Sequence, residues 1–192
     1  MISFLDGLDK SLFLLLNQLH HPKLDPIMLA ISYSETLLII LLLALFSYGF
    51  YKLKKTFFLA IFFSLLAFGV SDRVTSGIFK PGFERLRPCH SKDLKKKVHL
   101  AKDYCGGGKF GFVSSHASNS FAIALFFFLL FRRTNKYMIL LFLYAGLVSY
   151  SRIYLARHYP GDIFFGALFG LMCGFIFYKL YELSMKRLKA SK

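Results

Sequence analysis

Long apolar segments follow one another along most of this chain, and they constrain its fold more than any other feature. A helix needs roughly 17 to 25 mostly apolar residues to cross the hydrocarbon core of a bilayer. Five segments reach or approach that length, at residues 31–51, 56–78, 117–131, 137–154 and 162–183. The third is short, but the preceding residues 114–116 could extend the same helix. The sequence therefore predicts an all-α polytopic membrane helix bundle.

The first 26 residues differ from these segments and are expected to form an interfacial N-terminal region. Their apolar run LFLLL is too short to span a membrane and follows acidic residues. The acidic flank, with no small-residue cleavage site after the run, argues against a cleaved signal peptide. We expect residues 2–19 to form an amphipathic helix that lies in the membrane interface. A sixth spanning helix is the alternative, so the bundle is predicted to have five to six spans.

Basic residues in the connecting segments predict the orientation of the bundle. KLKK (52–55), RRTNK (132–136) and the C-terminal tail alternate along the chain with residues 80–115 and 151–161. Placing the first three segments in the cytoplasm puts the other two outside. The whole chain, residues 1–192, is predicted to form one domain. The outer loop 80–115 is itself rich in Lys and Arg, which indicates an anionic partner. A net charge of +15 would suggest nucleic acid for a soluble protein, but here we expect membrane lipids as partners and no nucleic acid.

Three polar stretches lie at the outer ends of the predicted spans. They are KPGFERLRP (80–88), GFVSSHASNS (111–120) and SRIYLARHYPGD (151–162). The predicted topology brings them to one membrane face, although they are far apart in the sequence. Together they offer cations, a hydroxyl, two imidazoles and a carboxylate: Lys80, Arg87, Ser114, His116, Arg152, His158 and Asp162.

This combination of side chains suits a phosphate group. Three cations and a hydroxyl can surround two or three negative oxygens, and Arg binds phosphate through two parallel hydrogen bonds. The free amides of a helix that begins near residue 115 would favour an anion at the same place. One histidine can serve as nucleophile and the other as proton donor, and Asp162 could hold His158 in one tautomer.

Metal chemistry fits this sequence poorly. The chain has ten acidic residues, and the outer face shows no carboxylate cluster or His/Cys spacing suited to a divalent ion. We therefore expect no metal and no other cofactor.

The three stretches resemble the type 2 phosphatidic acid phosphatase family. Its pattern is Lys, six residues, Arg-Pro; then Pro-Ser-Gly-His; then Ser-Arg, five residues, His, three residues, Asp. The first part is met by Lys80, Arg87 and Pro88, and the third part, with both gaps correct, by Ser151, Arg152, His158 and Asp162. The middle part departs from the family, because Val113 stands for Pro and Ser115 for Gly. Ser115 still has a backbone amide, so an amide-based anion site is retained.

The resemblance implies a role for each matching residue. His158 would attack phosphorus and form a phosphohistidine, Asp162 would orient it, and His116 would protonate the leaving oxygen and later activate water. The phosphoryl oxygens would be held by Lys80, Arg87, Ser114, Ser115 and Arg152. Such catalysis depends on positioning and electrostatic stabilisation.

The resemblance also implies a lipid-anchored phosphate or diphosphate as substrate, at the periplasmic or exterior face of a bacterial inner membrane. The SSHASNS and RPCH segments look most similar to members that act on undecaprenyl diphosphate or lipid A. We place undecaprenyl diphosphate first and lipid A second, followed by phosphatidylglycerophosphate and phosphatidic acid. A non-enzymatic protein that binds or transports anionic lipids would not need both histidines. A vanadium haloperoxidase shares the motifs, but such enzymes are typically soluble.

Four charged residues lie close to the motifs without belonging to them. We expect Arg85 and Arg157 to contact lipid head groups, although Arg157 could touch the substrate. Asp72 and Arg73, late in the second span, are costly in lipid and are expected to form a structural pair facing the bundle interior.

The sequence also contains three cysteines and a run of glycines. Cys89 and Cys105 both fall in the outer loop, where an oxidising compartment would permit a disulfide, but the sequence alone leaves this open. Cys173 is expected to be a buried small apolar residue. The glycines at 106–108 could form a phosphate-cradling loop, but they are interpreted as a flexible turn.

Overall fold

The computed structural model describes residues 2–33, 35–102 and 104–190. Within these ranges the chain is helical, and its β-structure is limited to an isolated bridge between Leu86 and Phe110. The α-helices are α1 (Ile2–Asn17), α2 (Asp25–Tyr33), α3 (Glu35–Leu53), α4 (Phe57–Val74), α5 (Lys80–Phe83), α6 (Ser115–Phe131), α7 (Leu140–Tyr154) and α8 (Pro160–Ala190). Short 3-10 or π segments are η1 (Lys54–Thr56), η2 (Thr75–Phe79), η3 (Pro88–His90) and η4 (Lys136–Ile139). The predicted all-α class is confirmed.

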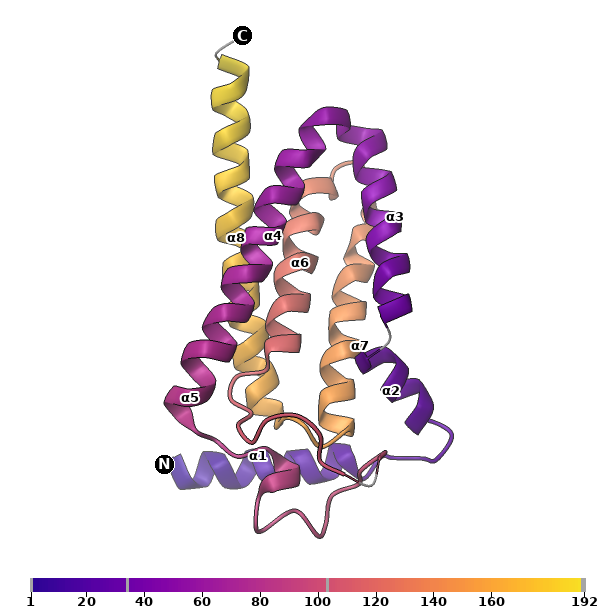
Figure 1. The fold of residues 1–192 in the computed structure, drawn as a ribbon, viewed down its shortest axis with the longest axis vertical. Helices are drawn as coiled ribbons and strands as arrows, with labels where there is room; N and C mark the ends of the chain where they lie inside the picture. The colour runs from indigo at the N-terminus through magenta and orange to yellow at the C-terminus, as the bar shows by residue number, and fades with distance from the viewer. Residues whose placement is uncertain (1, 34, 103, 191–192) are drawn as a thin grey trace.

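The helices α3, α4, α6, α7 and α8 run alongside one another and form the bundle (Figure 1). Ile39–Phe83 is a continuous apolar segment of 45 residues, but the chain reverses direction at η1, so this segment contributes two antiparallel helices (Figure 1). Lys136–Tyr154 and Pro160–Ala190 are also long and apolar enough to cross a membrane, whereas α6 is shorter. These helices correspond to the five predicted spans.

α2 and α3 point in different directions (Figure 1), so residues 31–33 do not continue the line of α3. A continuous span was expected from residue 31, but α2 ends at Tyr33 and α3 begins at Glu35; residue 34 lies outside the described residues. Ser32 is buried and accepts a hydrogen bond from Arg152, and the Arg152 guanidinium lies 5.1 Å from the centre of the Tyr33 ring. Arg152 of α7 thus contacts the end of α2.

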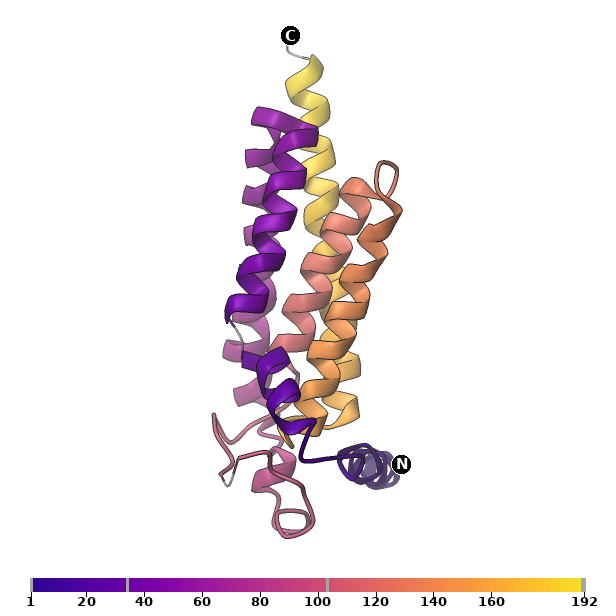
Figure 2. The ribbon, with the colours of Figure 1, turned by 90° about the vertical axis from the view of Figure 1, so that its right-hand side faces the viewer.

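α1 lies across the bundle axis at one end of the molecule (Figures 1 and 2). Phe4, Leu8 and Leu15 are exposed along it, whereas Phe13 and Asn17 are fully buried. The Asn17 side chain donates to the carbonyl of Tyr154 at 2.8 Å and accepts from the amide of His99 at 2.7 Å. α1 therefore does not run along the bundle as a sixth span would, and its location in the membrane interface stays a prediction.

α6 occupies the centre of the bundle, in contact with α4, α7 and α8. Its approach to α8 depends on Gly166, Gly170 and Gly174, which are four residues apart. A Cβ added at Gly170 would overlap the carbonyl oxygen of Ser118, and one at Gly166 would lie 2.6 Å from the carbonyl oxygen of Ser114. Small residues at this spacing let membrane helices approach closely. The packing places the first turn of α8 beside the first turn of α6.

The loop between α5 and α6 folds against α1 and the end of α7. Cys89 and Cys105 form a disulfide within it, which decides a pairing that the sequence left open. Cys89 packs in a small apolar cluster with Phe13, Ile153 and Tyr159. We call this end of the bundle, with α1 and the loop, the site end.

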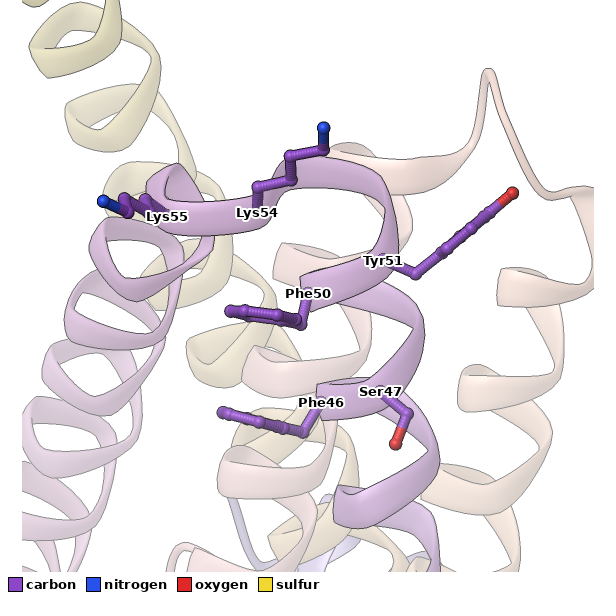
Figure 3. Close-up of a pocket in the computed structure, with 6 residues that line it drawn as sticks. All are labelled: Phe46, Ser47, Phe50, Tyr51, Lys54 and Lys55. Carbon is purple, nitrogen blue, oxygen red and sulfur yellow. The ribbon is translucent and has the colours of Figure 1, made fainter.

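The opposite end, which we call the far end, carries the turn at η1, the α6–α7 connection and the C-terminus (Figure 1). All three predicted cytoplasmic segments therefore lie together, away from the outer loop. An apolar cleft at this end is lined by Phe46, Ser47, Phe50, Tyr51, Lys54 and Lys55 (Figure 3). Its lining has no histidine or carboxylate, and it lies at the end of the bundle opposite the three polar stretches, so it is not a candidate for the chemistry. Cys173 is buried within α8, as expected.

Candidate active site

The structure brings the three polar stretches together at the site end. Lys80 begins α5, Ser115 begins α6, and Asp162 lies in the first turn of α8. Arg152 is in the last turn of α7, and His158 lies in the short connection to α8. All eight predicted site residues lie at this end: Lys80, Arg87, Ser114, Ser115, His116, Arg152, His158 and Asp162.

His158 and Asp162 form a buried pair. Nδ1 of His158 lies 3.4 Å from Oδ2 of Asp162, and both side chains are almost completely inaccessible. The same carboxylate oxygen accepts a hydrogen bond from the Tyr159 amide at 3.0 Å. Burial lowers the pKa of His158 to about 4, although the Asp162 carboxylate opposes this. The imidazole is therefore neutral at neutral pH, and because Nδ1 faces Asp162, Nε2 is the nitrogen available for attack.

Arg85 holds the other oxygen of Asp162. Its Nη1 donates to Oδ1 of Asp162 at 2.8 Å, and its Nη2 lies 2.8 Å from Oδ2 of Asp9 and 3.0 Å from Oδ1 of Asp6. Asp9 also accepts a hydrogen bond from the Gly161 amide at 2.7 Å. Arg85 therefore belongs to the site, and its predicted contact with lipid head groups was wrong. The sequence does not reveal this network, because Asp6 and Asp9 lie far from Arg85 and Asp162 along the chain.

Lys80 is positioned by the residue that departs from the family pattern. Its Nζ donates to the Ser115 hydroxyl at 2.8 Å, and the same hydroxyl accepts from Thr75 at 3.0 Å. Ser114 is the N-cap of α6, since its hydroxyl accepts from the Ala117 amide, and its own amide donates to the Asp162 carbonyl at 3.0 Å. The two serines thus connect the starts of α5, α6 and α8.

Arg87 and Arg152 supply two further buried cations. Arg87 donates to the carbonyl oxygens of Phe110 at 3.2 Å and Gly106 at 3.3 Å. Burial and the nearby charges of Arg152 and Arg157 lower the pKa of Arg87 to about 10, so it stays charged at neutral pH. Nε of Arg152 has no hydrogen-bond partner among the described residues. Both guanidinium groups can therefore accept an anion.

His116 differs from His158 in its surroundings. It lies in the first turn of α6 with an exposed side chain. Arg152, His158 and Lys80 are close enough to interact with it electrostatically. His116 is thus the histidine within reach of solvent, at the edge of the cation cluster.

Glycines that the motifs do not include allow the loop to pass close to these groups. A Cβ at Gly111 would lie 2.9 Å from Oδ2 of Asp162 and 3.6 Å from Nδ1 of His158. Gly107 has a φ of +82° and packs against Arg87. The glycine run is therefore a tightly packed turn and not simply a flexible one. The clustering of glycines just before the second motif was the sequence signal for this.

Asp72 and Arg73 were expected to form a structural pair that faces the bundle interior. Asp72 accepts a hydrogen bond from the Asn119 side chain at 2.9 Å, and Arg73 is exposed. The expected Asp72–Arg73 pair was wrong, because no ion pair joins the two residues in the part of the chain that the structure describes.

Among the described residues, Cys89, His90 and Cys105 lie close enough to share a metal, but the two cysteine sulfur atoms are joined as a disulfide.

The family of the chain follows from comparison with known proteins. The family model of the PAP2 superfamily matches residues 57–186. The chain belongs to the PAP2 superfamily. The matched region contains all three motifs and the helices that carry them, which confirms the resemblance drawn from the sequence.

Two curated relatives extend over nearly the whole chain. A lipid A 4'-phosphatase of Porphyromonas gingivalis is 37% identical over 180 residues, covering 93% of this chain and 75% of the relative. A lipid A 4'-phosphatase of Bacteroides thetaiotaomicron is 33% identical over 199 residues, covering 99% of this chain and 84% of the relative.

Two solved structures share the fold. Aquifex aeolicus LpxE superposes with a TM-score of 0.63 at 29% identity, covering 88% of this chain and 93% of that one. The first transmembrane PAP2 type phosphatidylglycerolphosphate phosphatase from Bacillus subtilis gives a TM-score of 0.68 at 22% identity, covering 93% and 86%; this likeness concerns the fold alone. Together the comparisons support a multi-pass membrane PAP2 lipid phosphatase.

Proposed function

We propose that this protein removes a phosphate from lipid A through a phosphohistidine intermediate. The observation that carries the reaction type is the neutral, buried His158 imidazole, oriented by Asp162 beside a cluster of cations. The substrate rests on the two relatives, each a lipid A 4'-phosphatase. Undecaprenyl diphosphate, which the sequence analysis placed first, has no comparable support, so lipid A takes its place.

The proposed reaction has two steps. Nε2 of His158 attacks phosphorus and forms a P–N bond while the P–O bond to the lipid breaks, and His116 gives its proton to the departing oxygen. Neutral His116 then takes a proton from water, whose oxygen attacks phosphorus and releases His158 and inorganic phosphate. In both steps Asp162, held by Arg85, fixes the His158 ring.

Positive side chains would stabilise the transition state. Lys80, Arg87 and Arg152 would bind the phosphoryl oxygens, with the amide of Ser115 at the start of α6 as a further donor. These cations would supply the charge that a metal ion supplies in other phosphatases, so we propose turnover without a metal. A protein that only bound anionic lipids would need these cations but neither histidine.

We further propose that the site faces the periplasm or exterior of a bacterial inner membrane. The basic segments 52–55 and 132–136 and the C-terminal tail lie at the far end (Figure 1). Such segments are retained in the cytoplasm.

Phosphate release by detergent-purified protein tests this proposal. We expect release from lipid A to exceed that from undecaprenyl diphosphate, phosphatidylglycerophosphate and phosphatidic acid, and to persist in EDTA. A preference for another lipid would overturn the substrate assignment. Loss of activity in EDTA that Mg²⁺ restores would overturn the metal-free mechanism.

A further inference from the structure

Arg85 and Arg157 both lie beside the motifs, but only one of them is paired. Arg85 contacts the carboxylates of Asp6, Asp9 and Asp162. Arg157 is only 8% exposed, yet its guanidinium forms no hydrogen bond and no ion pair with any described residue. Arg157 therefore has unused capacity to bind an anion.

The Arg157 guanidinium points to the same place as that of Arg87. From the position that a Cβ would take at Gly107, Nη1 of Arg87 is 2.6 Å away and Nη1 of Arg157 is 3.5 Å away. A Cβ at Gly106 would lie 2.7 Å from Nη2 of Arg157. Any side chain at these two glycines would occupy the space around both guanidinium groups. The two glycines therefore let the turn pack directly against both guanidinium groups, which lie side by side.

Most of the described charges around the two guanidinium groups are positive. Arg152 is close enough to repel both Arg87 and Arg157, and His90 is close to Arg87, Arg157 and Lys109. The Asp162 carboxylate is also nearby, but it is bound by Arg85. Cations gathered in this way repel one another, and a bound anion would relieve that repulsion.

We propose that Arg157 and the Gly106–Gly107 turn form a second anion subsite, next to the group of cations that binds the phosphate to be cleaved. The subsite would take a second phosphate or a carboxylate of the same substrate, and Arg87 would contact both anions. The inference rests on the proposed function, because it assumes that the cleaved phosphate lies against Arg87 and His158. The second anion could be the other phosphate of a diphosphate, or an acidic group on a sugar next to the cleaved phosphate.

Substrates that differ only in the second anion test the subsite. Farnesyl diphosphate and farnesyl phosphate carry the same lipid chain, and lipid A can be compared with lipid A bearing an acidic sugar near the cleaved phosphate. We expect Arg157→Gln to raise KM roughly tenfold to a hundredfold for the substrate with the second anion, and by less than about threefold for its partner. The pair that shows this contrast identifies the source of the anion.

Two further variants control the measurement. Arg157→Lys keeps the charge and should recover part of the loss, whereas Arg133→Gln removes an exposed arginine near the far end and should change neither KM. If Arg157→Gln raises KM equally for both members of each pair, or for no substrate, the proposed subsite is excluded.

A binding measurement separates this inference from the proposed function. If the wild-type protein cleaves none of these lipids, the proposed function fails, but inorganic pyrophosphate and phosphate can still be compared as ligands by thermal stabilisation. The subsite predicts that pyrophosphate stabilises the wild-type protein at lower concentration than phosphate does, and that Arg157→Gln removes the difference. Equal stabilisation of the wild-type protein by both anions would overturn it.

Discussion

Phe126 and Asp162 are both fully buried, but different interactions hold them. Phe126, towards the far end, packs against Phe127, Tyr178 and Tyr181, with ring centres 5.5 to 6.2 Å apart. Asp162, at the site end, is held by Arg85 at 2.8 Å and by the Tyr159 amide at 3.0 Å.

The difference follows from the cost of burying each side chain. Apolar packing is the sum of many weak contacts without direction, so the far end can lose one contact and keep its geometry. A buried charge needs specific partners at specific positions, so the site end depends on a few directional contacts. Substitutions at the site end should therefore change the rate of the reaction. Substitutions in the apolar contacts between helices should change the free energy of unfolding. The following predictions test that distinction, from the largest effect on turnover to the smallest.

The largest effect is expected for His158→Ala. Turnover of the folded protein should fall by roughly 10⁴- to 10⁶-fold, because no covalent step can begin. Phosphate release with each lipid measures the loss. His20→Ala, which removes an exposed histidine outside the site, should be fully active. A His158→Ala variant that keeps a tenth of its activity would exclude His158 as the nucleophile.

His116→Ala should lose less, and its loss should depend on the leaving group. General acid catalysis contributes roughly a hundredfold to ten-thousandfold. An alkoxide that leaves a phosphomonoester needs the proton more than an aryl oxide or a phosphate does. We therefore expect a larger loss of kcat on a lipid monoester than on an aryl phosphate. Equal losses on both would mean that His116 is not the proton donor.

The pH dependence should reveal the contribution of Arg85. Since burial lowers the pKa of His158 to about 4, kcat/KM should be insensitive to His158 protonation above that pH and fall as the pH drops through about 4. Arg85→Gln leaves the Asp162 charge without its guanidinium partner, which should raise the pKa of His158. The acid limb should then move to higher pH, with roughly a tenfold loss of kcat/KM at neutral pH.

Matched variants distinguish this effect from general destabilisation. Arg85→Lys keeps a charge and should shift the acid limb less than Arg85→Gln. Loss of activity with an unmoved acid limb would mean that Arg85 serves the fold alone.

The smallest effect on turnover is expected for Gly170→Ala, which acts on packing. Its Cβ would overlap the Ser118 carbonyl oxygen, so the free energy of unfolding should fall by about 1–3 kcal/mol. The folded fraction should retain kcat within about twofold. Gly146→Ala on α7, where a Cβ meets no atom within 4 Å among the described residues, should be neutral or slightly stabilising. Equal destabilisation by both substitutions, measured by thermal unfolding, would show that the α6–α8 contact is looser than described.

The apolar segments and the spacing of the three motifs were sufficient to predict the helical class and the family. They succeeded because each depends on residues that are near neighbours in the chain. A run of apolar residues selects a membrane helix whatever surrounds it, and the four-residue separation of His158 and Asp162 places them together at the start of one helix.

Contacts between distant segments could be decided only by the tertiary structure. The pairing of Arg85 with Asp6, the Cys89–Cys105 disulfide and the separation of α2 from α3 all required it. The four-residue spacing of the glycines in α8 is visible in the sequence, but the sequence does not reveal which helix they approach. Arg85 and Arg157 carry the same charge and lie equally close to the motifs in sequence. The fold places three carboxylates beside Arg85 and no described carboxylate within ion-pair distance of Arg157. An ion pair depends on distance in space and not on distance along the chain.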